Sequence, residues 1–154
     1  MKAALIGLLA VAAVAIGIGV YLVFRFDGGS STSKYAKQLD ALCLDTRRQV
    51  EALGQPSTTP MSKLYPGTVR IGRAFVKDAK RLQPPPEQAQ AAKTFVQASS
   101  LYYDGLDYAY QFLVVQKNQT AFVRIVDGAV ANLARAEAAA KTIGAKECTL
   151  RPFE

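Results

Sequence analysis

An uncharged apolar run near the N-terminus constrains this chain more than any other feature of its sequence. Residues 3–24 contain no Asp, Glu, Lys or Arg over 22 positions. As an α-helix, such a run is ~33 Å long, slightly more than the ~30 Å hydrocarbon core of a bilayer. We therefore predict that residues 1–26 form a transmembrane anchor that crosses the membrane once.

A cleaved secretory signal is the alternative interpretation of this run. The apolar region of a signal peptide is shorter, ~7–15 residues, and a small-residue cleavage site follows it. Here Tyr21, Phe24, Arg25 and Phe26 stand at the end of the run, which favours an uncleaved anchor. Cleavage within the sequence GGSSTS is the competing possibility.

Two opposing signals bear on the orientation of the chain in the membrane. Lys2 precedes the run, whereas Arg25, Lys34 and Lys37 follow it, so the positive-inside bias would place the larger part in the cytoplasm. Domains of this size, however, are translocated largely regardless of charge, and cysteines placed to pair indicate an oxidising compartment. We expect a single-pass protein of the cytoplasmic membrane whose domain faces the extracytoplasmic side.

The remainder of the chain divides into a linker, 27–32, and one helical domain, 33–154. The linker sequence DGGSST has the composition of a flexible coil. Apolar residues then recur with a helical period, and no segment has the alternation of a strand. The predicted helices cover 33–53, 68–83 and 87–117, followed by a fourth between the N-cap Asn118 and Gly144.

Short connections between four amphipathic helices predict an all-α fold. We expect an antiparallel up-and-down four-helix bundle with a C-terminal tail. The connection 54–67 is the long one, because its prolines and glycines oppose a continuous helix there.

Cys43 and Cys148 are the two cysteines of the sequence. The fourth helix, running back beside the first, would overshoot Cys43 by ~15–20 Å at ~1.5 Å per residue. A left-handed Gly144 would let the tail turn back, and residues 145–148, extended at ~3.3 Å each, nearly cover that distance. We predict a disulfide between Cys43 and Cys148, and two unrelated buried thiols are the alternative.

The layout resembles that of uncharacterised bacterial membrane-anchored extracytoplasmic helical proteins with a single span. The similarity rests on the apolar span, the small polar linker and the short motifs LDALC, LQPPPE and IGAKEC. It implies the compartment and the helical fold. It implies no activity and no site residue, because no chemistry is assigned to those proteins.

The chain lacks the residues on which most catalytic and metal sites depend. It contains no His, the commonest general base and zinc ligand, and neither GxxxxGK[ST] nor GxGxxG occurs in it. The acids Asp104 and Asp107 project away from the inward face of their predicted helix, so they do not form a paired-carboxylate site. We expect no enzyme activity, no catalytic residue, no cofactor and no metal site.

The helix predicted over 68–83 carries a basic stripe opposite its apolar face. The members of the basic stripe are Arg70, Arg73, Lys77, Lys80 and Arg81. A solvated face, partly paired with acids of neighbouring helices, is the ordinary interpretation. The functional interpretation is contact with anionic lipid headgroups or an acidic envelope protein. No aromatic residue interleaves with these cations to stack bases, so we expect no nucleic-acid partner.

The helix predicted over 87–117 has an apolar stripe away from its inward face. The members of the apolar stripe are Leu101, Tyr108, Phe112 and Val115. Either the loop 54–67, which brings Met61, Leu64 and Tyr65, covers this stripe, or the stripe is a surface for a partner or a second copy. The run LYYDGLDYAY could also line a ligand cavity beside Gly105, although aromatic residues at helical spacing are more often core.

These expectations combine into a membrane-anchored helical protein that mediates protein or cell-envelope contacts without catalysis. The alternative from another class is a small-ligand sensor or carrier with a tyrosine-rich interior.

Overall fold

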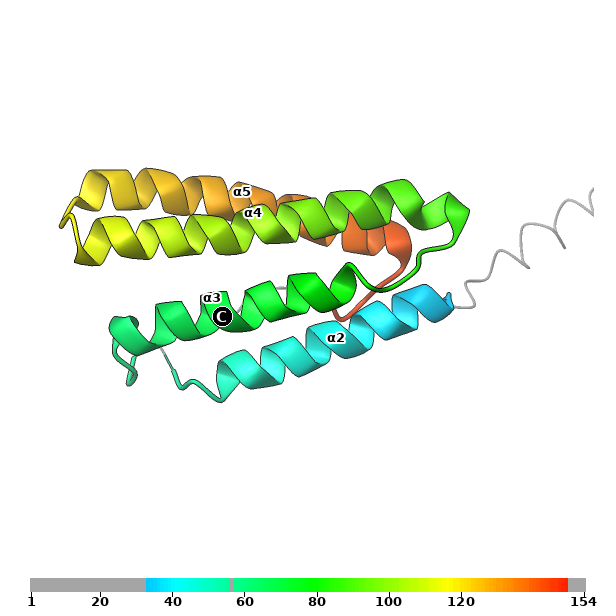
Figure 1. Cartoon of the computed structure of the whole chain (residues 1–154), viewed down its shortest axis with the longest axis horizontal. Helices are drawn as coiled ribbons and strands as arrows, with labels where there is room; N and C mark the ends of the chain where they lie inside the picture. The colour runs from blue at the N-terminus through cyan, green and yellow to red at the C-terminus, as the bar shows by residue number, and fades with distance from the viewer. Residues whose placement is uncertain (1–32, 56, 150–154) are drawn as a thin grey trace, which may run out of the picture. The chain divides into compact units, whose positions relative to one another are not determined.

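The computed structural model describes residues 33–55 and 57–149, and all regular structure in these residues is helical (Figure 1). The elements are α2 (Lys34–Glu51), α3 (Met61–Ala79), the single 3-10 turn η1 (Pro86–Gln88), α4 (Ala89–Val114) and α5 (Gln119–Ile143). No strand occurs in these residues, which confirms that the described part of the chain is all-α and has four α-helices.

The predicted anchor, 1–26, and linker, 27–32, lie outside the described residues, as does the end of the tail, 150–154. The unit that contains the four helices spans Thr32–Glu154. Among the helices of the described ranges, none has an apolar stretch long enough to cross a bilayer.

Side-chain and backbone caps explain where α2 and α5 begin and where α5 ends. The Ser33 hydroxyl accepts a hydrogen bond from the Ala36 N–H at 3.1 Å, and the Asn118 side chain accepts one from the Ala121 N–H at 3.0 Å. Each bond satisfies one of the amide donors that a helix start leaves unpaired. Gly144 ends α5 with a left-handed φ of 85°, as predicted.

The start of α3 differs from the prediction of a loop over 54–67. The helix begins at Met61 and continues through Pro66, which has no N–H to donate to the carbonyl of Ser62 and whose ring crowds that carbonyl. Against a cost of ~3 kcal/mol for a helical proline, burial of Leu64 stabilises by ~1.5–3 kcal/mol. The ring of Tyr65 adds a stack on Tyr110, with the centroids 6.0 Å apart. Tertiary packing therefore offsets the local preference against a helix.

The helix predicted over 87–117 is shorter at both ends. The prolines at 84–86 lead into the η1 turn, so the α-helix begins at Ala89. At the other end, α4 stops at Val114, and Lys117 has a positive φ of 51° in the short turn before α5.

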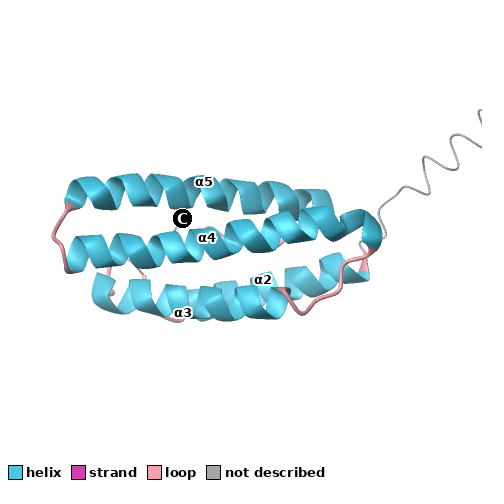
Figure 2. Cartoon of the chain, turned by 45° about the horizontal axis from the view of Figure 1, so that its top comes forward, coloured by secondary structure: helices cyan, strands magenta, loops and turns pink. Residues whose placement is uncertain are grey.

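Consecutive helices lie side by side and antiparallel. Tyr65, near the start of α3, stacks on Tyr110, near the end of α4, whereas Phe75, near the end of α3, meets Phe95, near the start of α4, at 5.9 Å. Two views show the helices as two pairs, α4 with α5 and α2 with α3 (Figures 1 and 2). The contact between α3 and α4 joins the two pairs. The contact between α4 and α5 is the most extensive.

The core lies between these helices and is rich in alanine and aromatic side chains. Phe95 and Leu39 are completely buried, and they pack with side chains from every α-helix. The larger buried members include Tyr35, Val69, Phe75, Val76, Tyr102, Tyr103, Leu106, Leu133 and Ile143.

Two glycines let helices approach closely. At Gly72, a Cβ atom would overlap the ring of Tyr103, so the missing side chain makes room for the tyrosine. At Gly105, a Cβ would stand 3.0 Å from the methyl group of Ala129. Gly105 therefore lets α5 approach α4 closely. The sequence allowed a ligand cavity beside Gly105, but Ala129 occupies this space.

The Gly72→Ala substitution tests this packing. Alanine is favoured over glycine in a helix by up to ~1 kcal/mol, but the overlap with Tyr103 forces repacking that costs ~1–3 kcal/mol. We expect a net loss in the free energy of unfolding, measured by urea denaturation followed by circular dichroism. Gly128→Ala in α5 is the matched control, because nothing lies within 4 Å of its added Cβ, and it should stabilise. Equal effects of the two substitutions would contradict the close contact.

Candidate functional site

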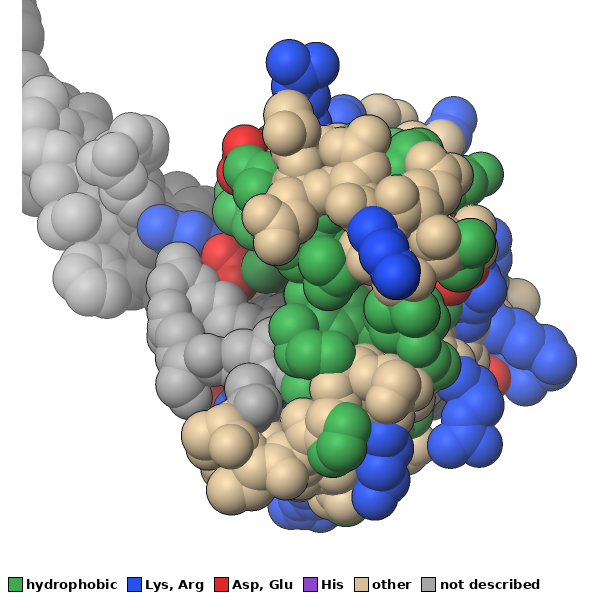
Figure 3. Space-filling model, turned by 90° about the vertical axis from the view of Figure 1, so that its left-hand side faces the viewer, with side chains coloured by type: hydrophobic (Ala, Val, Ile, Leu, Met, Phe, Trp, Pro, Cys, Tyr) green, Lys and Arg blue, Asp and Glu red, His purple; other side chains and the backbone are tan. Residues whose placement is uncertain are grey.

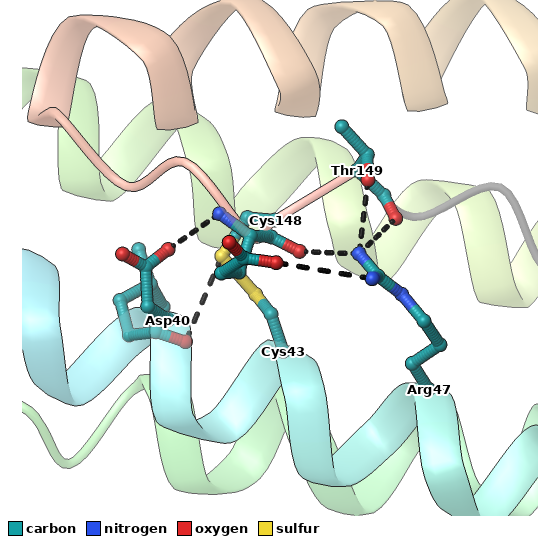
Figure 4. The surroundings of a disulfide bond; sticks show 7 residues. Asp40, Cys43, Arg47, Cys148 and Thr149 are labelled. Atoms are coloured by element: carbon teal, nitrogen blue, oxygen red, sulfur yellow. Dashed lines mark hydrogen bonds and ion pairs between the residues drawn. A yellow bond between two sulfur atoms is a disulfide. The ribbon is translucent and has the colours of Figure 1, made fainter.

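A disulfide joins the tail to the first helix of the domain. Cys43 in α2 and Cys148 in the tail are bonded, their Cα atoms are 5.1 Å apart, and both side chains are buried (Figure 4). The predicted pairing is confirmed. The predicted route is confirmed as well, because the chain reverses at the left-handed Gly144 and returns along α2.

Polar contacts hold the tail on both sides of the disulfide (Figure 4). On one side, the backbone N–H of Glu147 donates to Oδ1 of Asp40 at 2.8 Å. On the other side, Nη2 of Arg47 donates to the Glu147 carbonyl at 2.7 Å and to Oγ1 of Thr149 at 2.9 Å. Asp40, Cys43 and Arg47 follow one another at helical spacing in α2, so a single face of this helix binds the tail.

Gln88 connects three helix ends at the same end of the domain. Its Nε2 donates to the carbonyl of Ile143, the last residue of α5, at 3.2 Å. Its Oε1 accepts from the hydroxyl of Ser33, which caps α2, at 3.1 Å. The start of α4, the end of α5 and the start of α2 are therefore tied together beside the tail.

The five members of the basic stripe are all exposed, but they differ in their partners. Arg73 donates to Asp104 at 3.1 Å and to Asp107 at 3.0 Å, and both acids belong to α4. Arg81 pairs with Asp78 at 3.0 Å. Arg70, Lys77 and Lys80 make no ion pair within the described part of the chain. We call these three residues the unpaired cations.

The Arg73 pairing explains why the two carboxylates of α4 lie outside the core. The sequence predicted that Asp104 and Asp107 face away from the inward side of their helix. In the structure both carboxylates lie at the surface, where they pair with Arg73 of α3. Their hydrogen bonds and charges raise the pKa of the Arg73 guanidinium. The two acids more than neutralise Arg73, so the positive potential of this face comes from the unpaired cations.

A surface pocket of about 310 Å³ lies beside the Arg73–Asp104 pair, between α3 and α4. Its lining residues are Arg73, Val76, Lys77, Lys80, Ser100, Tyr103 and Asp104. The pocket was not predicted from the sequence, because its lining residues belong to two different helices. The available signal was the i, i+3 spacing of Lys77 with Lys80 and of Ser100 with Tyr103, which places each pair on one helix face.

The apolar stripe of α4 is largely uncovered. Leu101 is 51% exposed, Tyr108 59% and Val115 75%, whereas Phe112 is half-buried. Of the loop residues that the first of the two alternatives would place over the stripe, Leu64 is in the core and Tyr65 stacks on Tyr110. Seen from the end where α4 turns into α5, hydrophobic side chains fill the middle of the surface, and Lys and Arg side chains project around them (Figure 3).

The tyrosine-rich run of α4 contributes to the core. Tyr102 and Tyr103 are buried, and their rings meet edge to face with centroids 4.9 Å apart. Burial raises the pKa of both phenols well above the ordinary 10.0, because the low-dielectric interior disfavours the phenolate. Both hydroxyl groups therefore remain protonated donors over the physiological pH range.

Residues 33–55 and 57–149 contain no group of three or more Asp, Glu, Cys or His side chains that could hold a metal ion.

Comparisons of the chain with known protein families, curated proteins and solved structures give no match.

Loss of the disulfide should destabilise the domain strongly. The bridge spans 105 residues of sequence, and bridges of this size contribute ~2–5 kcal/mol. We expect the double variant Cys43→Ser/Cys148→Ser to lose this amount of unfolding free energy in urea titrations of the full chain in detergent. Arg47→Ala, which keeps the bridge and removes tail hydrogen bonds, should lose only about 1 kcal/mol. An unchanged double variant would show that the bridge does not support the fold.

The buried phenols predict a distinct alkaline titration. A phenol whose pKa is higher in the folded state stabilises the fold fully below the unfolded pKa of ~10, and this contribution is lost as the pH rises further. We expect Tyr102 and Tyr103 to ionise well above pH ~10, when phenolate absorbance and circular dichroism are followed in parallel. Ionisation of every tyrosine near pH ~10 in a still-folded domain would contradict their burial.

Proposed function

We propose that this protein is a membrane-anchored, extracytoplasmic helical domain that binds an anionic surface of the cell envelope and catalyses no reaction. The observation that carries the proposal is the set of unpaired cations, Arg70, Lys77 and Lys80, which extends along the exposed side of α3. Exposed cations near an anionic membrane attract it by ~1 kcal/mol each. The paired arginines of the same stripe contribute less.

The disulfide supports the extracytoplasmic location. Structural disulfides persist in oxidising compartments and are rare in the cytosol. Both cysteines are buried, and the bridge links the first helix of the domain to its C-terminal tail. A buried link of this kind is typical of a structural disulfide rather than a catalytic one. A single span formed by residues 3–24 would place the domain outside the cytoplasmic membrane.

The position of the cations within the domain supports contact with lipid. Because α2 and α3 are antiparallel, Lys77 and Lys80, at the end of α3, lie at the end of the domain where α2 begins. The linker 27–32 joins the chain at that same end, and six extended residues reach at most ~20 Å. An anchored domain on such a tether stays within reach of the headgroups.

Contact with an envelope protein is the second candidate, favoured by the exposed apolar stripe Leu101, Tyr108, Phe112 and Val115. Uncovered apolar side chains of this kind are typical of protein interfaces. The alternative of a ligand carrier with a tyrosine-rich interior is less well supported, because the rings of Tyr102 and Tyr103 pack on each other and Ala129 fills the space at Gly105.

The test is capture of anionic vesicles by the full chain held in neutral phosphatidylcholine nanodiscs. We expect flotation with phosphatidylglycerol vesicles, and its loss in the variant Arg70→Gln/Lys77→Gln/Lys80→Gln. The matched control is Arg124→Gln/Arg135→Gln/Lys141→Gln, which removes the same charge from exposed positions of α5. The proposal fails if both triple variants bind equally well, or if the wild-type chain captures neutral vesicles to the same extent.

A further inference from the structure

The pocket between α3 and α4 combines charge with neutral hydrogen-bond donors. Lys77 and Lys80 line it from α3, and neither ammonium group has an acidic partner in the described ranges. The Asp104 carboxylate in its wall is already bound by Arg73. The lining side chains therefore have an excess of positive charge that no protein group neutralises.

Two residues that carry hydroxyl groups, Ser100 and Tyr103, also line this pocket. Neither Ser100 nor Tyr103 makes a side-chain hydrogen bond to any described residue. A buried tyrosine normally places its hydroxyl against a polar partner, and the Tyr103 hydroxyl is not enclosed in the core, since it is absent from the fully buried polar atoms without a partner. The ring itself is fixed against Gly72, so the residue is held rigidly at the pocket.

From this convergence we infer that the pocket binds a phosphate group, with Lys77 and Lys80 as charged donors and Ser100 and Tyr103 as neutral donors. Phosphate oxygens accept several charge-assisted hydrogen bonds at once, and lysine is a common partner for them. A volume of about 310 Å³ is at the lower end of the range for ligand pockets and suits a small phosphate ester.

The inference rests on the proposed function and gives it a specific chemistry. The phosphate can belong to a lipid headgroup or to a soluble ester, and the contacts would be the same. A diffuse attraction between the basic stripe and a membrane depends only on charge. Binding in the pocket depends also on the two hydroxyl groups, which carry no charge, and this difference separates the two ideas experimentally.

The experiment uses the full chain in nanodiscs of digalactosyldiacylglycerol, a neutral lipid whose headgroup contains no phosphate. Titration calorimetry with sn-glycerol 3-phosphate and with inorganic phosphate measures the soluble ligands, and flotation with phosphatidylglycerol vesicles measures the lipid. We expect Ser100→Ala and Tyr103→Phe each to weaken binding about tenfold, as is typical for the loss of a hydrogen bond to a charged group. Lys77→Gln/Lys80→Gln should abolish it. Gln90→Ala, which removes an exposed uncharged polar side chain from the same helix outside the pocket, is the control and should bind like wild type.

The outcomes distinguish the inference from the function on which it rests. Wild-type affinity in both Ser100→Ala and Tyr103→Phe overturns the pocket inference, and vesicle capture that still depends on the unpaired cations would then leave the proposed function standing. Loss of glycerol phosphate binding in the hydroxyl variants, without capture of anionic vesicles by the wild type, supports the pocket for a soluble ester and overturns the membrane contact. Loss of both kinds of binding in the hydroxyl variants assigns the lipid headgroup.

Discussion

The disulfide between Cys43 and Cys148 is the constraint on which the arrangement of the domain depends. The first helix, α2, packs directly against α3, and on its other side it is held by the returning tail. The bridge fixes that tail, and Asp40 and Arg47 orient it from one helical turn before and after Cys43. A short terminal segment thus connects the first helix of the domain to the end of the last one. This arrangement fits an oxidising compartment, in which such a bond forms and persists.

The contact between α3 and α4 that builds part of the core also determines which surface charges are paired. Packing of α3 on α4, fixed by Tyr103 at Gly72 and by the Phe75–Phe95 pair, brings Asp104 and Asp107 to Arg73. These ion pairs are exposed and contribute little to stability. They also determine which cations stay unpaired, because Lys77 and Lys80, which line the pocket between α3 and α4, have no acidic partner among the described residues. The sequence shows five cations on one helix face. In the fold Arg73 and Arg81 are paired, whereas the unpaired Lys77 and Lys80 line one pocket.

Much of this structure could be predicted from local sequence chemistry. The Asn118 cap and the left-handed Gly144 bound the last helix as expected, and the return of the tail to Cys43 followed from helix length and the reach of an extended chain. The start of α3 could not be predicted in this way. Pro66 and Gly67 indicate a loop locally, and only the burial of Leu64 and the stacking of Tyr65 on a distant tyrosine reverse that preference. The pocket between α3 and α4 could not be predicted for a related reason, since its lining residues come from two helices and meet only when these helices pack.

The redox state of the two sulfur atoms in the cell tests the account most directly. Cells that produce the full chain are lysed under denaturing conditions in the presence of an alkylating reagent, and the mass of the protein is measured with and without prior reduction. The account predicts no alkylated cysteine before reduction and two after it. Alkylation of both Cys43 and Cys148 without reduction would contradict the disulfide, and with it the extracytoplasmic location and the envelope function proposed for the domain.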